Sequence, residues 1–234
     1  MTCSEYLNAL KGDYDFIRKL SNKNGARIIL LKHKTLGTRL VLRQYETPVL
    51  AYDFLKTVKF ENLPLVFDTV TLDDGQLVFE EYIDGITVAD VLENAPYTYS
   101  GARAVIASVC DALALVHEAG LVHRDIKPEN IMLSREGTVK LIDFNAARRV
   151  TENSEKDTVQ IGTVGYAPPE QLGLAQSDSR TDIYALGVLL NVMLTGVHPS
   201  KRLADGRAGK IILKCTRIDP SSRYQSVNEL KKAL

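Results

Sequence analysis

The sequence has little cysteine, no excess charge of either sign and no long uninterrupted apolar run. Its three cysteines are odd in number, widely separated and without CxxC spacing, which argues against a disulfide framework and fits a reducing, cytoplasmic location. Twenty-nine basic residues balance 29 acidic ones, so no overall field favours nucleic acid or an anionic membrane. No apolar run reaches the roughly 18 residues of a membrane helix, and the start, MTCSEYLNALKGDYDF, lacks the pattern of a signal peptide. We therefore expect neither a membrane segment nor a nucleic-acid partner.

What is present is an ordinary globular composition, 45% hydrophobic and 25% charged over 234 residues. This length suits one large domain or two tightly joined lobes. The first part, up to about Glu81, is rich in β-forming runs, and the character changes after Asp84-Gly85. Strands are predicted at ARIILLKHK (26–34), TRLVLRQY (38–45), LPLVFDTVTL (63–72) and QLVFEEY (76–82).

Three segments show helical periodicity. The first, PVLAYDFLKTV (48–58), would place Leu50, Phe54, Leu55 and Val58 on one face. The second, residues 100–120, is long and amphipathic and can end at Gly120. The third, residues 181–196, is apolar on almost every side, which predicts a buried helix. A small β-rich part is thus followed by a larger helical part.

A polar loop lies between two apolar runs in GLVHRDIKPENIML (120–133). Asp125 and Asn130 are five residues apart, and Asp143 follows in the later run TVKLIDFNAA. Three such oxygen-bearing groups in one site suit phosphoryl transfer, because a carboxylate can orient a hydroxyl while an amide and a second carboxylate hold Mg²⁺. This loop is the main functional candidate in the sequence.

Five motifs occur in order with fitting gaps: HRDIKPEN, DFN, GTVGYAPPE, SRTDIYALGVLL and DPSSRY. On these motifs the chain resembles the eukaryotic-type serine/threonine protein kinases from about Asp15 to Leu234. The resemblance implies an α+β, two-lobed kinase-like fold, with a small β-rich N-lobe and a larger, mainly helical C-lobe. Residues 1–234 would form a single domain, with the N-lobe at about 13–82, the hinge at about 81–85 and the C-lobe at about 86–234.

The resemblance also implies roles for the polar loop. Asp125 would be the catalytic base and Lys127 would approach the γ-phosphate of ATP. Asn130 and Asp143 would bind Mg²⁺, and His123 would hold the loop in place. ATP and magnesium are therefore the expected cofactors, and protein hydroxyls the expected substrates, since Thr163 matches a substrate-side threonine of the family.

A nucleotide pocket is implied by the same resemblance. Its wall would be formed by apolar side chains, and the backbone between Glu81 and Ile83 would bond to adenine. Arg43 stands at the position of the lysine that grips the phosphates, and Ala51 at that of its glutamate partner; Asp53 would face elsewhere. The apolar wall would consist of Leu20, Ile28, Val41, Met132 and Ile142.

The N-lobe departs from the family pattern in two ways. LSNKNGARI (20–28) replaces the glycine-rich loop, which weakens its backbone cradle for phosphates. Arg43 keeps the positive charge of lysine but presents a planar fork. Glu80, at the back of the adenine pocket, would be costly to bury unpaired, so we predict an Arg43–Glu80 salt bridge. The alternatives are that Glu80 turns to solvent, or that Lys23 serves as a relocated phosphate lysine.

Other matches are expected to be structural or regulatory. Glu170 would pair with Arg223, and Asp182 would hold the backbone of the catalytic loop. The segment after GVHPS is shorter than is usual in the family, so a peripheral helix should be missing there. In such proteins an arginine at the position of Arg124 often binds a phosphate on the activation loop. The candidate phosphate acceptors here are Thr151, Ser154 and Thr158.

Three functions are compatible with these residues. The leading hypothesis is a serine/threonine protein kinase that uses Mg-ATP. The alternative is a pseudokinase that acts as a binding or scaffold module, favoured by Arg43, Ala51, Val41 and the eroded glycine loop. A small-molecule phosphotransferase of the same fold is disfavoured by Lys127 in HRDIKPEN and by GTVGYAPPE.

Overall fold

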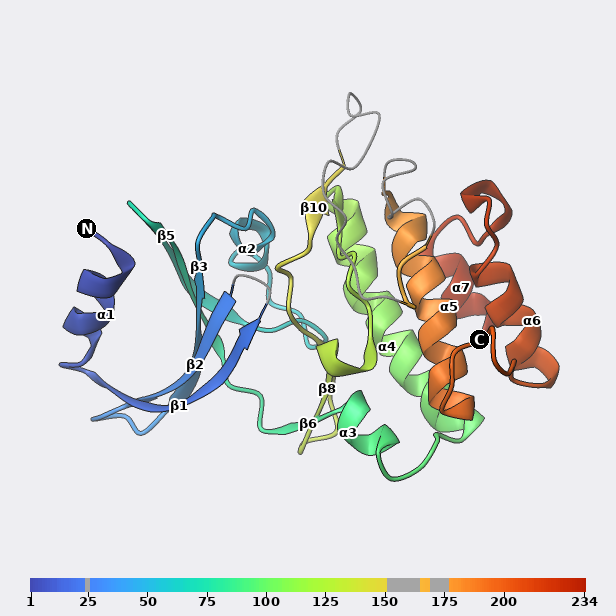
Figure 1. The fold of residues 1–234 in the computed structure, drawn as a ribbon, viewed down its shortest axis with the longest axis horizontal. Helices are drawn as coiled ribbons and strands as arrows, with labels where there is room; N and C mark the ends of the chain where they lie inside the picture. Colours follow the sequence, from blue (N-terminus) through green and yellow to red (C-terminus); the bar gives the residue numbers. More distant parts are fainter. Residues whose placement is uncertain (24–25, 151–164, 169–176) are drawn as a thin grey trace. The chain divides into compact units, whose positions relative to one another are not determined.

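The computed structural model describes residues 1–23, 26–150, 165–168 and 177–234, apart from the side chains of residues 22 and 23. The chain divides into two compact units, Met1–Asp84 and Gly85–Leu234, which we call the N-terminal unit and the C-terminal unit. Figure 1 shows that the first is built mainly from strands and the second mainly from helices. Each unit is described by itself below.

The N-terminal unit contains a five-stranded antiparallel sheet in the order β1-β2-β3-β5-β4. The four strands predicted from sequence are confirmed, with ends that differ by a few residues. The shortfall is largest at β4, which begins after the segment Leu63-Pro64-Leu65. The strands are β1 (Tyr14–Lys23), β2 (Ala26–His33), β3 (Arg39–Tyr45), β4 (Val66–Leu72) and β5 (Gly75–Glu81).

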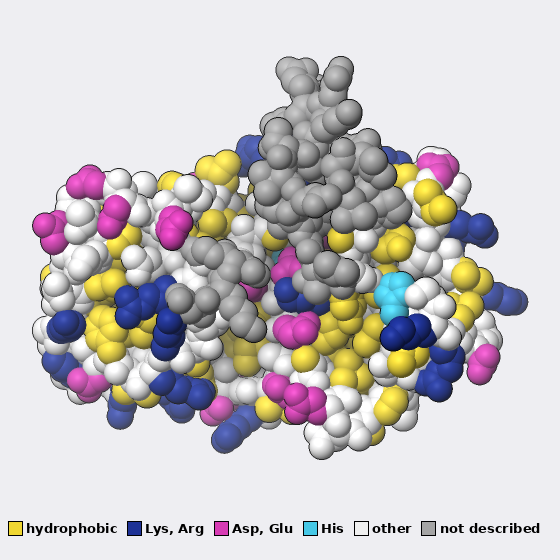
Figure 2. Space-filling model, in the orientation of Figure 1, with side chains coloured by type: hydrophobic (Ala, Val, Ile, Leu, Met, Phe, Trp, Pro, Cys, Tyr) yellow, Lys and Arg dark blue, Asp and Glu magenta, His cyan; other side chains and the backbone are white. Residues whose placement is uncertain are grey.

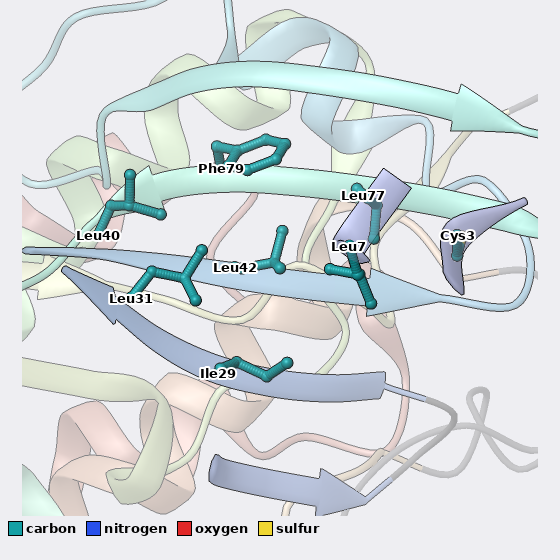
Figure 3. Packing of buried hydrophobic residues seen from close by; sticks show 8 residues of the cluster. All are labelled: Cys3, Leu7, Ile29, Leu31, Leu40, Leu42, Leu77 and Phe79. Carbon is teal, nitrogen blue, oxygen red and sulfur yellow. The ribbon is translucent and has the colours of Figure 1, made fainter. Parts of the chain in front are cut away.

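One face of this sheet is covered by helix α1 (Cys3–Leu10). Because side chains alternate along a strand, Leu40 and Leu42 of β3 point to this face, as do Leu77 and Phe79 of β5. Leu7 and Cys3 of the helix pack onto them (Figure 3). The sequence reading missed α1, although Thr2 and Glu5 form a complete capping box at its start.

The opposite face carries helix α2 (Ala51–Leu55), and Figure 1 shows α1 and α2 on opposite sides of the sheet. The predicted helix over 48–58 is too long, and its predicted apolar face is right at Leu55, which is buried, but wrong at Leu50, which is 62% exposed. Tyr52 is fully buried instead, and its hydroxyl lies 2.8 Å from that of Tyr45 on β3. This tertiary contact decides which side of the short helix faces inward.

The C-terminal unit is organised around a buried helix, α5 (Ser179–Thr195), which ends at Gly196 with a left-handed backbone. Both helices predicted for this part are confirmed, and Gly120 has a φ of 70° just beyond the long helix α4. The helices of this unit are α3 (Val88–Leu92), α4 (Tyr99–Glu118), α5, α6 (Gly206–Cys215) and α7 (Val227–Ala233), with 3₁₀ turns η1 (Pro128–Asn130) and η3 (Pro220–Ser222). Its short strands are β6 (Gly85–Thr87), β7 (Leu121–Val122), β8 (Ile131–Ser134), β9 (Val139–Leu141) and β10 (Arg148–Arg149).

The connection between α5 and α6 is short and, in this fully described stretch, contains no helix, as predicted. Its anchor is Asn191 of α5, which is completely buried. The amide of Asn191 donates to the carbonyls of Val197 (2.9 Å) and Arg202 (2.8 Å), and its oxygen accepts from the N–H of Ala204 (2.9 Å). One side chain thus makes three hydrogen bonds to the backbone of this irregular segment.

Helix α4 is long and apolar enough to cross a membrane by length and composition, although the sequence has no uninterrupted apolar run of that length. Core helices pass the same test, and α4 buries one side against α5 and α7. All three cysteines lie among the described residues, where they are free and buried. On the face shown in Figure 2, basic and acidic side chains are interspersed with hydrophobic ones.

Candidate active site

The polar loop predicted as the functional candidate lies between β7 and β8 of the C-terminal unit, and its backbone is held by Asp182 of α5. One carboxylate oxygen of Asp182 accepts from the N–H of His123 (2.9 Å), and the other from the N–H of Arg124 (2.8 Å). The predicted role of Asp182 is confirmed. His117 of α4 adds a third contact, 2.8 Å from Asp182, which the sequence reading missed.

Asp182 is fully buried, so its charge depends on these partners. Burial alone would raise the pKa of its carboxyl, but the contact with His117 and the other hydrogen bonds leave the pKa below its ordinary value. Asp182 is therefore ionised and provides a fixed negative end to which the loop backbone is attached.

His123 is buried completely and fixes the loop from the other side. One ring nitrogen lies 3.2 Å from the carbonyl of Ile142, and the other accepts from the N–H of Asp125. The ring also packs edge-on against Phe144, with centroids 4.6 Å apart. Burial lowers the pKa of His123, so the ring is neutral and acts as a spacer between the loop and the strand after it.

Asp125, Lys127 and Asn130 meet within this loop. The ammonium of Lys127 is 2.7 Å from the Asp125 carboxylate. The amide nitrogen of Asn130 donates to the same carboxylate at 2.9 Å and to the Asp125 carbonyl at 2.8 Å. Asp125 is 7% exposed and Asn130 4%, so the carboxylate is held in one orientation by neighbours that are themselves packed.

Asp143 lies next to Asn130 because of the β8–β9 pairing. Ile131 is opposite Leu141 in this hairpin, and the N–H of Ile142 donates to the carbonyl of Asn130 at 2.9 Å. Since both donors from the Asn130 amide nitrogen go to Asp125, its amide oxygen could act as a metal ligand, and the Asp143 carboxylate could act as a second. Two such hard oxygen ligands would fit Mg²⁺, whose remaining ligands are usually water and phosphate oxygens. Among the described residues there is no cluster of three or more His, Cys, Asp or Glu side chains that could hold a metal ion.

Backbone strain is concentrated at this site. Arg124 has a φ of 68° and Asp143 a φ of 66°, and they alone among the described non-glycine residues have positive φ. A left-handed backbone costs such residues roughly 1–2 kcal/mol. Asp182 compensates at Arg124 by accepting its N–H, and the bond between Ile142 and Asn130 fixes the backbone just before Asp143. Strain of this kind is typical of functional sites.

The N-terminal unit contains the predicted Arg43–Glu80 ion pair, which is confirmed. Arg43 on β3 lies opposite Val78, and Glu80 on β5 lies opposite Val41, so the two charged side chains are diagonal neighbours on one face of the sheet. Both are nearly buried, at 4% and 3% exposed. The alternative in which Glu80 turns to solvent is wrong.

The other residues predicted for the nucleotide pocket fall in both units. Ile28 on β2 lies opposite Arg43, on the same face as Val41 and Glu80. Leu20 is 39% exposed on β1, the N–H of Glu81 bonds to the carbonyl of Leu65, and Ile83 is buried. Ala51 is buried at the start of α2, and Asp53 is exposed, as expected. Met132 and Ile142 belong to the C-terminal unit and are half-buried.

Some predictions concern residues outside the described part of the chain. These are the partner role of Glu170, the substrate-side role of Thr163, the acceptors Thr151, Ser154 and Thr158, and the side chain of Lys23. Arg223 is described, and its guanidinium donates to the carbonyls of Arg217, Ile218 and Arg180 at 2.8–3.1 Å. It is buried at the end of η3 and lies over the ring of Tyr184.

An antiparallel five-stranded sheet, a helical unit and a strained loop with Asp, Lys and Asn in this arrangement define the class of protein. The chain belongs to the protein kinase domain family, whose model matches residues 11–233. Its fold is the α+β, two-lobed kinase fold.

Three curated relatives show how far the similarity extends. Serine/threonine-protein kinase PknB of Mycolicibacterium smegmatis is 36% identical over 181 residues, 66% of this chain and 29% of that protein. A probable serine/threonine-protein kinase, CPE1738 of Clostridium perfringens, is 28% identical over 248 residues, 94% of this chain and 36% of that protein. An Aurora kinase of Candida glabrata is 30% identical over 240 residues, 97% of this chain and 67% of that protein. The chain thus spans 29% and 36% of the lengths of the two bacterial relatives.

Proposed function

We propose that this protein is a serine/threonine protein kinase that transfers the γ-phosphoryl group of Mg-ATP to protein hydroxyls. The observation that supports it most is the fixed Asp125 carboxylate, which contacts Lys127 at 2.7 Å and Asn130 at 2.9 Å. Two of the bacterial relatives are named as a serine/threonine-protein kinase and a probable one, which agrees with this class. A reducing, cytoplasmic location for the chain, with its three free cysteines, is part of the same proposal.

In this proposal the loop works by positioning and electrostatics. Asp125 accepts the proton of the incoming hydroxyl and orients its oxygen for attack. Lys127, which carries a positive charge beside Asp125, moves its ammonium towards the transferring phosphoryl group. Because the loop backbone is hydrogen-bonded to Asp182, Asp125 and Lys127 are already positioned before the reaction begins.

Asn130 and Asp143 would hold the metal through their side-chain oxygens. When bound, magnesium offsets the negative charge of the phosphates. In this proposal the nucleotide contacts Leu20, Ile28, Val41, Arg43, Glu81 and Ile83 of the N-terminal unit.

A second candidate function, a pseudokinase that binds partners with little catalysis, is favoured by one observation. Arg43 stands where the family has its phosphate lysine, yet its guanidinium is buried against Glu80. Releasing Arg43 to a phosphate would separate the buried Glu80 carboxylate from this cation, which is costly. If the Arg43–Glu80 ion pair persists when nucleotide is present, Arg43 is not available to bind the phosphates as the lysine of an active kinase is.

Two measurements separate these functions. The first is thermal unfolding with ATP, with and without Mg²⁺, because a ligand at 100 times its Kd stabilises the folded state by about 2.7 kcal/mol. The second is transfer of labelled phosphate to a generic protein substrate by the wild type and by Asp125→Asn. The variant removes the base but keeps the shape of the side chain, so a kinase should lose about 10²–10⁴-fold of its rate.

Controls make both measurements decisive. Asp111→Asn, on the exposed surface of α4, should leave phosphate transfer unchanged. Nucleotide binding that depends on Mg²⁺, without transfer above the Asp125→Asn background, would favour the pseudokinase. Failure to bind nucleotide at all would reject the kinase proposal.

A further inference from the structure

A cavity of about 420 Å³ lies within the N-terminal unit, between the C-terminal end of α1, the β2–β3 turn and the sheet. We call it the α1 cavity. It opens on the sheet face that carries Leu40 and Phe79, whereas Val41 and Arg43 point to the opposite face. The α1 cavity is therefore separate from the residues proposed to contact nucleotide, and its size falls in the range of about 300–1,000 Å³ that is usual for small-molecule sites.

Aromatic rings make up much of its lining. Tyr6 of α1 and Phe79 of β5 lie with ring centroids 6.3 Å apart, and Tyr14 of β1 meets the ring of His33 edge-on at 4.9 Å. Phe67 of β4 completes the wall, although 52% of it is exposed. Such rings offer flat apolar surfaces to a ligand that is itself flat.

A β-bulge builds part of the cavity. Val66 is opposite Glu80 and Asp68 is opposite Phe79, so Phe67 is the extra residue in β4. In a regular strand Phe67 and Asp68 would point to opposite faces, yet both line the α1 cavity. This irregularity leaves a large apolar side chain exposed and directs it into the cavity rather than into the core.

The polar groups of the cavity favour an anion. His33 accepts from the N–H groups of Thr35 and Leu36 at its Nδ1, both at 3.2 Å, so the proton of the neutral ring is on Nε2, which is a donor. Arg39 lies over the ring of Tyr82 at 4.7 Å, a stacking that leaves the N–H edge of its guanidinium available. Asp68 is the carboxylate of the lining, and its charge is balanced by Lys56 at 2.6 Å, which lowers the pKa of Asp68.

We propose that the α1 cavity binds a small aromatic carboxylate. Its rings would pack among Tyr6, Phe67 and Phe79, and its carboxylate would accept hydrogen bonds from the guanidinium of Arg39 and the Nε2–H of His33. A planar fork such as that of Arg39 matches a carboxylate in geometry as well as charge. Binding would cover Phe67 and Leu36, which are exposed large apolar residues of this unit.

The test uses 2-naphthoate as the probe and 2-naphthylmethanol as its uncharged analogue, with binding measured by calorimetry. We expect saturable binding of the acid, and weaker binding of the alcohol by about tenfold, since it lacks the charge-assisted contacts. ATP should not displace the probe, because Ile28, Val41 and Arg43, which are proposed to contact nucleotide, point to the opposite face of the sheet. This expectation is independent of the proposed kinase activity.

Matched variants locate the site. Arg39→Gln and Phe67→Ala should each weaken binding of 2-naphthoate by about fivefold to tenfold, through lost hydrogen bonds and lost ring contact respectively. Two control substitutions outside the cavity should leave binding unchanged: Arg18→Gln, at an exposed arginine of β1, and Leu50→Ala, at an exposed apolar residue. Circular dichroism checks that Phe67→Ala is folded, and Arg39→Gln tests the site independently of it.

Four outcomes would overturn the proposal. The first three are no saturable binding at millimolar probe, displacement by ATP, and binding that Arg39→Gln and Phe67→Ala leave unchanged. Equal affinity for the acid and the alcohol would also reject it, because the assigned ligand class rests on the carboxylate.

Discussion

The two units hold their charged functional side chains in different ways. In the C-terminal unit, Asp125 and Asn130 stand in the family's motif, and a buried carboxylate, Asp182, fixes the loop that carries them. In the N-terminal unit Arg43 is held by Glu80 from the neighbouring strand. The same requirement, a positioned charge with little solvent around it, is met by backbone hydrogen bonds in one unit and by a new ion pair in the other.

This difference shows what each arrangement tolerates. A loop fixed through backbone N–H groups can keep its shape whatever side chains face the substrate, because Asp182 contacts no side chain of the loop through those bonds. An ion pair between two strands depends on both partners, so neither can change alone without leaving a buried charge. The predictions below test this contrast, from the largest expected effect to the smallest.

Removing one partner of the buried pair should have the largest effect on stability. Arg43→Met should lower the free energy of unfolding by about 3–5 kcal/mol, because the Glu80 carboxylate remains buried without its main cation. Urea unfolding followed by circular dichroism measures this change.

The control for this prediction is an exposed pair in the same unit. Lys56→Met removes the contact between Lys56 and Asp68, whose side chains are 44% and 53% exposed respectively. It should lower the free energy of unfolding by under about 1 kcal/mol. The double variant Arg43→Met/Glu80→Leu should recover much of the loss, since an apolar pair can replace a buried ion pair. Equal losses for Arg43→Met and Lys56→Met would contradict the buried-pair account.

The C-terminal unit should instead show a pH dependence set by His123. Because burial lowers the pKa of His123, the folded state keeps the ring neutral while the unfolded chain takes up a proton below its ordinary pKa of 6.5. Stability should therefore fall as the pH drops below 6.5, by up to about 1.4 kcal/mol per pH unit from this group.

His123→Gln removes this titration, so unfolding of the variant measured from pH 7.5 to 5 should have a smaller slope than the wild type. The variant should be less stable at neutral pH, because the contacts to Ile142 and Asp125 are altered. Asp182, whose pKa is lowered, contributes stability that is lost only as the pH falls below its ordinary 3.8, outside this window. Parallel slopes for the two proteins would rule out His123 as the source.

The smallest expected effects compare helix caps in the two units. Thr2→Ala removes the cap of α1, and Thr87→Ala removes the equivalent capping box of α3. Each should lower the free energy of unfolding by about 1 kcal/mol. Chemical unfolding of both variants checks this, and the absence of any effect of Thr2→Ala would show that α1 adds little to the N-terminal unit.

The sequence predicts most of the sheet and the long helices because their apolar residues repeat with periods of two and 3.6. Short elements are less predictable. Helix α1 has only a brief apolar pattern, although the spacing of Thr2 and Glu5 indicates a helix start. For helix α2 the sequence predicts the buried Leu55 but not the buried Tyr52, whose partner Tyr45 lies on strand β3.

Within the candidate site, the contact between Asp125 and Asn130 and the role of Asp182 follow from the motifs. The contact of His117 with Asp182 does not, since these residues are 65 positions apart and nothing near His117 in the sequence points to its partner. The left-handed backbone at Arg124 is equally hidden, because arginine is not a residue type that favours it. The Arg43–Glu80 pair was predictable because both residues depart from the expected kinase pattern and their charges are opposite.

The two left-handed residues of the loop region have a consequence for laboratory evolution. Glycine adopts this backbone at no steric cost, so a selection for heat resistance alone would enrich glycine at positions 124 and 143. At position 143 that change deletes the carboxylate, so under the proposed kinase function a selection for phosphate transfer would remove the same variants. Sequencing the survivors of the two regimes would show, from these two codons alone, which pressure the population had experienced.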